Sequence, residues 1–193
     1  MTTLNIQPLG QVLGARIHDL DLSQRLDDEV IEAIVMALGR YGAISFPRQK
    51  LTPKQQLDFS ARFGELEVNV ANAYQEPGIP QMMILSNMVE NGKPVGIADA
   101  GQDWHTDMTY NRVPGFVNVL VAHKVPMRDG KPLGGTAFTN TQAAYDDLPS
   151  DVKTRLTNAT ALHDHNQFQE LMRSKGSTRP AQTEAQKRSR PPV

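Results

Sequence analysis

The N-terminal part of the chain alternates short apolar runs with turn residues before a helical pattern begins. Residues 4–17 mix short apolar runs with two glycines, which predicts one or two short strands joined by turns. Acidic residues 27–29 then precede apolar residues at helical spacing, namely Val30, Ile31, Ile34, Val35 and Leu38. Acidic side chains favour the positive end of a helix dipole, so a helix with one apolar face is predicted. An apolar run at residues 43–46, closed by Pro47, predicts a short strand.

A second helix is predicted by its start signals more than by its apolar face. Thr52 can cap the helix, Pro53 suits its first position, and Gln55 completes a capping box. Apolar residues continue the pattern over residues 57–63, and Gly64 is a natural stop. The sequence therefore predicts a helix that ends near Gly64.

Short strands are predicted for the middle of the chain. Strands are expected at residues 82–85, 116–122 and 136–139, with a tight turn at Asn91-Gly92 and a Pro/Gly-rich loop over residues 126–135. Two further helices are expected at about residues 141–145 and 150–156. Helices that pack against such a β core indicate an α+β fold with a mainly β core. An antiparallel sandwich or barrel is favoured over a doubly wound sheet.

The last segment differs in composition from the rest. Residues 174–193 are rich in Ser, Thr, Gln, Lys, Arg and Pro and offer almost nothing to bury, which predicts a polar loop or disordered tail. We therefore place a single domain at residues 1–173. The basic run at residues 187–190 has no interleaved aromatic residues, so nucleic-acid binding by it is not predicted.

Composition narrows the chemistry that is available. The 193 residues have 39% hydrophobic and 21% charged residues and a formal net charge of -1, so neither nucleic acid nor an anionic membrane is an expected partner. The chain has no cysteine, which excludes disulfides, Cys-ligated zinc and thiol nucleophiles. We see neither a signal peptide nor the apolar run of roughly 20 residues that spans a bilayer, so a cytoplasmic location is expected.

His105 and Asp107 are the candidate metal ligands. Residues two apart in a strand point to the same side, so both side chains could reach one ion. Imidazole and carboxylate together suit iron(II), manganese or zinc. The spacing by itself leaves a metal site and an ordinary surface pair both open.

Four stretches of the chain carry a family resemblance. They are QDWHTDMTY (102–110), FSARFGEL (59–66), GGTAF (134–138) and AAYDDLP (143–149). They resemble, in the same order, elements of the iron(II)/2-oxoglutarate-dependent dioxygenases of the taurine and chlorophenoxyacetate dioxygenase family. The resemblance covers roughly residues 5–170. It implies a double-stranded β-helix, or jelly roll, with flanking helices, incomplete at its C-terminal end.

The resemblance implies roles for the metal and co-substrate residues. His105 and Asp107 take the positions of two Fe(2+) ligands, and Thr136 takes that of the threonine that contacts the 2-oxoglutarate carboxylate. The family's third ligand, a distal histidine, and its 2-oxoglutarate-binding arginine are expected beyond Val193. His163 and His165 are interpreted as structural residues rather than as a replacement. If the 193 residues are the whole protein, we expect little or no activity.

The implied reaction is hydroxylation of a small organic acid by dioxygen, with release of succinate and CO2 from 2-oxoglutarate. Asn69 and Asn72 match positions where the taurine enzyme carries its sulfonate-binding His and Tyr. Both are neutral, which weakens recognition of a sulfonate, so a carboxylate and a taurine-like sulfonate are both candidate substrates. Met108 and Tyr110 are expected to line the substrate pocket, with ordinary core packing as the alternative.

Other functions and assembly states remain open. A non-catalytic jelly-roll module that binds a metal or ligand, or an inactive truncated fragment, is the main alternative. A zinc hydrolase has less support, because no further ligand cluster or general base stands out. A homo-oligomer and a monomer are both compatible with the sequence.

Overall fold

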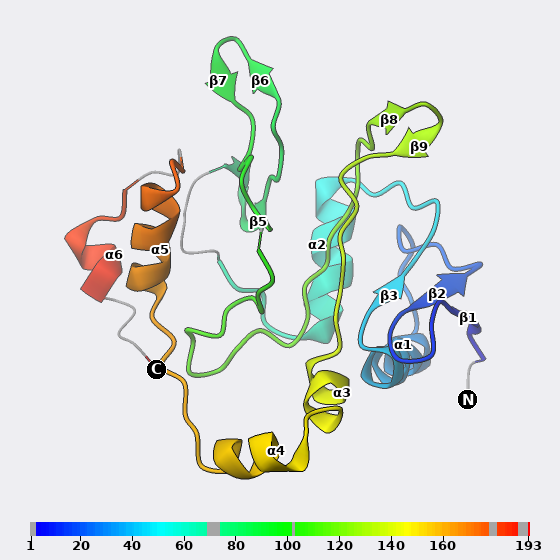
Figure 1. Cartoon of the computed structure of the whole chain (residues 1–193). Helices are drawn as coiled ribbons and strands as arrows, with labels where there is room; N and C mark the ends of the chain where they lie inside the picture. The colour runs from blue at the N-terminus through cyan, green and yellow to red at the C-terminus, as the bar shows by residue number, and fades with distance from the viewer. Residues whose placement is uncertain (1–2, 69–73, 102, 178–180, 189–192) are drawn as a thin grey trace. The chain divides into compact units, whose positions relative to one another are not determined.

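The computed structural model describes residues 3–68, 74–101, 103–177, 181–188 and 193 (Figure 1). The chain forms two compact units, each described here by itself. Unit 1 contains Met1–Phe63 and Val119–Ala159, and unit 2 contains Gly64–Asn118 and Thr160–Val193. The domain boundary that we predict at residue 173 stays a prediction.

A small three-stranded sheet begins unit 1. Strand β1 (Asn5–Pro8) pairs antiparallel with β2 (Ala15–His18), and β3 (Ile44–Ser45) adds to β2 in parallel. The turn between β1 and β2 closes through the Leu9 amide, which donates to the Gly14 carbonyl at 2.9 Å. Gly14 has φ 93°, in a region that glycine adopts without steric cost. The strands expected within residues 4–17 and 43–46 are thus confirmed.

Helix α1 (Asp28–Tyr41) is the amphipathic helix that the apolar spacing predicts. Asp28 and Glu29 occupy its first turn, and the helix ends at Gly42, whose amide donates to Leu38 O at 2.7 Å. Its buried residues recur every three positions, as a helix with one apolar face requires, and they are Ile31, Ile34 and Ala37.

Helix α2 (Pro53–Ser60) begins as the sequence predicts. The Thr52 hydroxyl accepts from the Gln55 amide, and the Gln55 side chain accepts in return from the Thr52 amide. The α-helix ends at Ser60, earlier than expected, and a 3-10 turn, η1 (Ala61–Phe63), continues to Gly64. Gly64 has φ 140°, which explains why the helical path stops there.

The core of unit 1 lies among α1, α2 and the first sheet. Its buried members are Ile17, Leu22, Ile31, Ile34, Ala37, Leu51 and Phe59. The Phe59 ring meets Phe46 and Phe63 edge to face, with centroids 6.1 and 5.2 Å away. Burying one large aliphatic side chain contributes about 1.5–3 kcal/mol, so this cluster is a principal stabilising element of the unit.

The later part of unit 1 departs from several expectations. The Pro/Gly-rich stretch contains a hairpin of β8 (Met127–Arg128) and β9 (Lys131–Pro132). Asp129 and Gly130, with φ 50° and 74°, form the two-residue turn that hairpins prefer. Helices α3 (Thr141–Asp146) and α4 (Ser150–Leu156) confirm the two late helices.

Residues 116–122 and 136–139, which we expected to be strands, form none within the described structure. A strand needs a neighbouring backbone to pair with, and these apolar runs have no such partner among the described residues. Val119 and Val121 instead pack against the core of unit 1, and Val119 O accepts from Gln56 Nε2 at 3.2 Å. Apolar periodicity alone does not predict whether a neighbouring strand is present to pair with.

Unit 2 contains two small hairpins and two helices. Strand β4 (Gln75–Glu76) pairs with β5 (Ile79–Met83), which overlaps the strand expected at residues 82–85. The second hairpin consists of β6 (Val89–Glu90) and β7 (Lys93–Pro94). It turns at Asn91 and Gly92, with φ 50° and 75°, and confirms the tight turn expected there.

The helices of unit 2 lie in its C-terminal part. Helix α5 (His165–Ser174) begins after Asp164, whose side chain accepts from the Asn166 amide. Helix α6 (Glu184–Arg188) forms within the segment expected to be a polar loop or tail. Val193 exchanges backbone hydrogen bonds with His163 at 2.8 and 3.1 Å.

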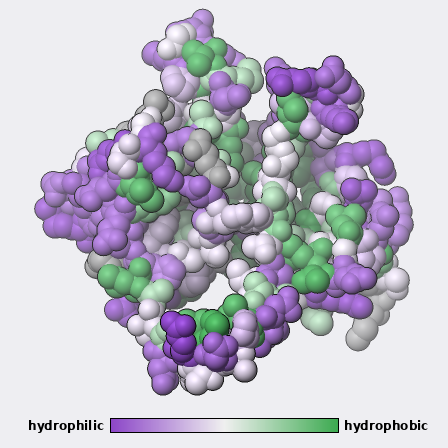
Figure 2. Space-filling view, viewed as in Figure 1, coloured by the Kyte–Doolittle hydropathy of each residue, from purple (hydrophilic) through white to green (hydrophobic). Residues whose placement is uncertain are grey.

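Large apolar side chains are exposed on both units. Figure 2 shows apolar residues interspersed with hydrophilic ones on the visible face. Exposed examples are Trp104, Val113, Phe116, Leu120 and Phe138. The described residues form helices and short sheets, which do not by themselves make up a complete double-stranded β-helix. Among the described helices, none combines the length and apolar character needed to cross a bilayer.

Candidate functional site

The candidate metal ligands lie in a turn of unit 2. Residues 104–106 carry no strand, and residues 107–110 form a turn in which Met108 has φ 60°. The Asn111 amide closes this turn on Met108 O at 3.0 Å. Our expectation that alternation in a strand aligns His105 and Asp107 is therefore wrong. The turn brings the two side chains together by another route.

The two side chains meet at their ligating atoms. His105 Nε2 lies 3.1 Å from Asp107 Oδ1, and the two side chains are 50% and 53% exposed. Such exposure leaves the pair open to solvent and to a ligand. Two hydrogen-bond acceptors at this separation need a proton or a metal cation between them. The contact of the other ring nitrogen shows whether Nε2 is an acceptor.

The Nδ1 atom of His105 lies 2.7 Å from the Asp103 carbonyl oxygen. A carbonyl oxygen only accepts hydrogen bonds, so Nδ1 is the protonated nitrogen. In a neutral ring this leaves a lone pair on Nε2, which faces a carboxylate oxygen that is also an acceptor. Metal-bound histidines are commonly oriented in this way, with the other ring N–H donated to a carbonyl or carboxylate.

Asn118 fixes the carboxylate of Asp107 from the other side. Asn118 Nδ2 donates to Asp107 Oδ2 at 2.9 Å, so Oδ1 stays directed at His105. Sequence reasoning did not identify Asn118, because it lies 11 residues further along in a stretch expected to be a strand. Only the folded chain shows this contact.

The donor atoms fit two adjacent positions on a metal ion. Nitrogen and oxygen ligands bind such ions at about 2.1 Å, and two ligands at a right angle are then about 3.0 Å apart. The 3.1 Å separation of His105 Nε2 and Asp107 Oδ1 meets this requirement. Within the described residues, no group of three or more His, Asp or Glu side chains is arranged around one ion. The described part of the chain thus supplies a pair of ligands.

A lysine from the far end of α5 reaches the same turn. Lys175 Nζ lies 2.8 Å from Asp103 Oδ2, and the two side chains are 48% and 72% exposed. The hydrogen bond from Lys175, and then its charge, lower the pKa of the Asp103 carboxyl below its ordinary value, with a smaller lowering from the charge of His105. Asp103 is therefore ionised under neutral conditions. No local pattern predicts this pairing, because it joins residues 72 positions apart.

Met108 and Tyr110, expected to line a substrate pocket, pack within unit 2. The Tyr110 hydroxyl donates to Met108 Sδ at 3.1 Å, and both side chains are half-buried. The Tyr110 ring lies 4.4 Å from the ring of His165, centroid to centroid. His165 is buried and has Gln169 Nε2 3.4 Å from its Nε2 atom. These contacts are compatible with either a pocket wall or core packing.

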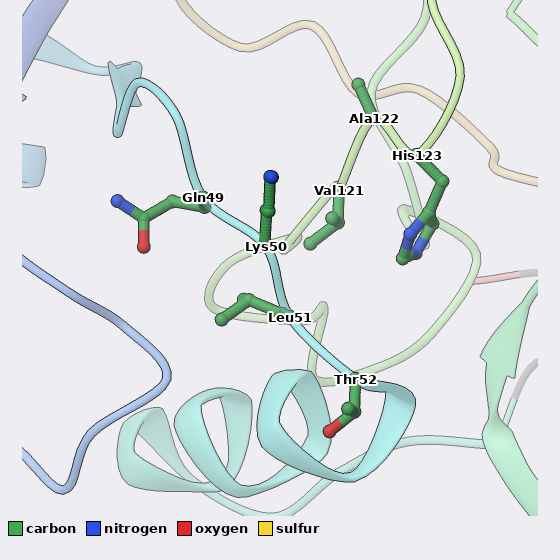
Figure 3. Close-up of a pocket in the computed structure, with 7 residues that line it drawn as sticks. All are labelled: Gln49, Lys50, Leu51, Thr52, Val121, Ala122 and His123. Carbon is green, nitrogen blue, oxygen red and sulfur yellow. The ribbon is translucent and has the colours of Figure 1, made fainter.

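A cavity lies elsewhere, on unit 1. It has a volume of about 300 Å³, and Figure 3 shows it between the segment that leads into α2 and the segment that carries His123. Gln49, which lines it, is held by the Leu22 amide and Leu20 carbonyl at 2.9 and 2.8 Å. This cavity does not contain the His105–Asp107 pair, so it is not the candidate site.

Comparison with known protein families shows to which family the chain belongs. A family-wide sequence model described as "Taurine catabolism dioxygenase TauD, TfdA family" matches residues 5–193. The chain belongs to this family. The resemblance carried by the four sequence stretches is thereby confirmed.

Two curated relatives illustrate the TauD/TfdA membership. The chain is 31% identical to pentalenolactone F synthase of Streptomyces avermitilis over 157 residues, 80% of this chain and 50% of that protein. It is 30% identical to the alpha-ketoglutarate-dependent 2,4-dichlorophenoxyacetate dioxygenase of Cupriavidus pinatubonensis over 198 aligned positions, 96% of this chain and 65% of that protein. The chain thus spans half to two thirds of the length of these relatives.

A solved structure shares the fold. AAD-2, in complex with Mn(II) and N-oxalylglycine, has a TM-score of 0.61 with this chain at 22% identity, covering 99% of this chain and 62% of that one. At this identity the likeness concerns the fold alone. It supports the TauD/TfdA fold for this chain, although the described residues do not form a complete β-helix.

Three further residues are expected to act in a TauD/TfdA site. Thr136, the expected 2-oxoglutarate contact, is an exposed residue of unit 1 outside any strand. Asn69 and Asn72, the expected substrate contacts, lie outside the described residues. Their roles therefore stay predictions.

Proposed function

We propose that this chain carries part of the active site of an iron(II)- and 2-oxoglutarate-dependent oxygenase. The observation that carries the proposal is the His105–Asp107 pair, in which Nε2 faces Oδ1 at 3.1 Å while Nδ1 donates to a carbonyl. Membership of the TauD/TfdA family supports the same conclusion. The name of one relative, an alpha-ketoglutarate-dependent dioxygenase, supports 2-oxoglutarate as co-substrate.

Each residue of the pair would hold the metal with a partner behind it. His105 would bind through Nε2, oriented by the Asp103 carbonyl, and Asp107 through Oδ1, oriented by Asn118. Such outer partners fix the ring and the carboxylate before the metal arrives. A facial site needs a third protein ligand, which the described residues do not group with this pair.

Bound iron(II) would supply the oxidation of a substrate C–H bond by dioxygen, coupled to conversion of 2-oxoglutarate to succinate and CO2. The protein supplies orientation and access. His105 and Asp107 each remain about half exposed, so co-substrate and dioxygen can approach the side of the pair that faces solvent. Thr136 would contact a 2-oxoglutarate carboxylate, and the fold around the site would be a jelly roll.

The proposed substrate is a small organic acid, either a carboxylate or a taurine-like sulfonate. Met108 and Tyr110, just past the metal pair, would form an apolar wall with one hydroxyl. Asn69 and Asn72 would offer neutral hydrogen-bonding groups rather than charged ones. A carboxylate also fits the name of the 2,4-dichlorophenoxyacetate relative.

The metal assignment is tested with Mn(II), a paramagnetic stand-in for iron(II). We expect Mn(II) to broaden the NMR signals of residues 103–110 in the wild-type chain and to lose this effect in His105→Ala and Asp107→Ala. His123→Ala is the matched control, because it removes an exposed histidine outside the pair. Unchanged broadening in both site variants would contradict the assignment.

Turnover is tested separately with iron(II), 2-oxoglutarate and a panel of small carboxylates and sulfonates. Succinate formation that depends on His105 and Asp107 would support the oxygenase. A chain that binds metal through the pair and forms no succinate with any substrate would favour the non-catalytic binding module instead.

A further inference from the structure

Helix α5 contacts the segment 103–110, which carries the proposed ligands, through residues at or next to both of its ends. At its first residue, the His165 ring packs on Tyr110 with a centroid distance of 4.4 Å. Just past its last turn, Lys175 Nζ binds Asp103 Oδ2 at 2.8 Å. His105 and Asp107 lie between Asp103 and Tyr110 in the sequence. The segment that carries the proposed ligands is therefore held to one helix on either side.

A second contact strengthens the C-terminal attachment. Ser177 Oγ donates to Asp99 Oδ2 at 2.6 Å, two residues beyond Lys175 and four before Asp103. Ser177 is itself held near the helix, because its amide donates to Met172 O at 3.0 Å. Met172 is one of the buried residues of unit 2. The attachment is thus anchored in packed structure, although Lys175 is partly exposed.

A continuous set of contacts runs from α5 to the proposed metal ligand. Lys175 holds the Asp103 carboxylate at 2.8 Å, and the backbone carbonyl of the same Asp103 accepts from His105 Nδ1 at 2.7 Å. The carbonyl selects the tautomer of His105 in which Nε2 carries the lone pair. Whatever fixes residue 103 therefore influences which nitrogen of His105 is available to a metal.

We propose that Lys175 is a positioning residue for this site, which holds Asp103 so that its carbonyl orients His105 for metal binding. The inference rests on the proposed function of the His105–Asp107 pair. Lys175 touches neither ligand in the contacts described; it acts through Asp103. Through Lys175, helix α5 helps to orient a proposed metal ligand, in addition to packing on Tyr110.

A positioning role of Lys175 and a purely electrostatic effect of its charge predict opposite changes in metal affinity. Removing a cation near the site and leaving Asp103 ionised would, by Coulomb attraction alone, strengthen the binding of a metal cation. A positioning role predicts the opposite sign, because His105 loses its orientation. Lys175→Met, which keeps most of the aliphatic stem, tests this sign.

The first experiment measures the tautomer of His105 in the metal-free chain by long-range ¹H–¹⁵N NMR. The measurement is made on the singly protonated ring, in which the Nδ1–H and Nε2–H tautomers are distinguished. We expect the Nδ1–H tautomer to predominate in the wild type, to lose population in Lys175→Met, and to be retained in Lys175→Arg. Lys54→Met is the control, because it removes a lysine–aspartate pair of similar length, 2.7 Å, in unit 1. An unchanged tautomer in Lys175→Met would overturn the proposal.

The second experiment is a Mn(II) titration of the same four proteins. We expect Lys175→Met to weaken binding by about two- to five-fold, the scale of an exposed ion pair, with rescue by Lys175→Arg and no change in Lys54→Met. Equal or tighter binding by Lys175→Met overturns the positioning role.

The two experiments separate the two ideas. If the wild type shows the Nδ1–H tautomer and its dependence on Lys175 but binds no Mn(II), the proposed metal function fails and the positioning of His105 stands. If Mn(II) binds through His105 and neither readout responds to Lys175, the positioning role fails alone. Unchanged backbone chemical shifts away from residues 99–110 and 172–177 show that Lys175→Met is folded.

Discussion

His105 Nε2 and Asp107 Oδ1 lie 3.1 Å apart in a turn, with the histidine's other nitrogen already committed to a carbonyl. Two acceptor atoms face each other in this arrangement when the imidazole is neutral. A metal cation or a second ring proton between them resolves the conflict, so the arrangement is compatible with the proposed metal site. The same geometry leads to the first prediction.

Asp107→Asn is expected to abolish metal binding without disturbing the turn. The new amide can donate to His105 Nε2 and still accept from Asn118, so every hydrogen-bonding group at the site keeps a partner. Mn(II) broadening of residues 103–110 should disappear, while the Nδ1–H tautomer of His105 persists. Mn(II) binding at wild-type strength would show that the Asp107 carboxylate is not a ligand.

Asn118→Ala is expected to weaken Mn(II) binding by about ten-fold, because partners behind a metal ligand typically contribute 10- to 100-fold to affinity. The physical reason is the loss of the 2.9 Å hydrogen bond that orients Asp107. Asn111→Ala is the control, since Asn111 donates to Glu67 at 2.7 Å and does not contact Asp107 in the contacts described. A similar effect of both variants would indicate a general change in the segment.

The carboxyl of Asp103 is expected to titrate below the ordinary aspartate pKa of about 3.9, because Lys175 favours its ionised form. A lowered pKa in the folded chain means that the ion pair contributes stability above that pH and loses it as the pH falls through the folded value. NMR titration of the Asp103 carboxyl carbon checks this. In Lys175→Met its pKa should move back up towards the ordinary value, and an unchanged titration would argue against the pairing.

Thr52→Ala is expected to lower the free energy of unfolding by about 1 kcal/mol, the usual cost of losing a helix cap. The Thr52 hydroxyl accepts a hydrogen bond from the Gln55 amide. Amides in the first turn of a helix have no carbonyl partner within the helix, so this amide loses its acceptor in the variant. Thr52→Ser keeps the hydroxyl and should retain most of the stability. Urea denaturation followed by circular dichroism measures the difference.

Ile34→Ala is expected to destabilise the chain by about 2 to 5 kcal/mol, because it leaves a cavity in the core of unit 1. Ile34 is 1% exposed, whereas Met36 on the same helix is 74% exposed. Met36→Ala is therefore the matched control, with an expected change within about 0.5 kcal/mol. Equal effects of the two substitutions would show that α1 does not bury the face described.

The helices were predictable because their signals are local. The Thr52 capping box, the apolar spacing of α1 and the turn at Asn91-Gly92 each depend on residues within one or two turns of backbone. The pairing of His105 with Asp107 was also within reach, although for the wrong reason, since a turn rather than a strand aligns them. Local sequence thus indicated the proposed ligands without their backbone geometry.

The tertiary structure decided everything that depends on a distant partner. Residues 116–122 have the composition of a strand, yet a strand forms only when another backbone supplies hydrogen bonds, and no described neighbour does so. Asn118 and Lys175 come from 11 and 72 residues away to hold Asp107 and Asp103. The sequence by itself determined which atoms could bind a metal. Folding decided how they are held, because hydrogen bonds and ion pairs act over a few ångströms of space and not along the chain.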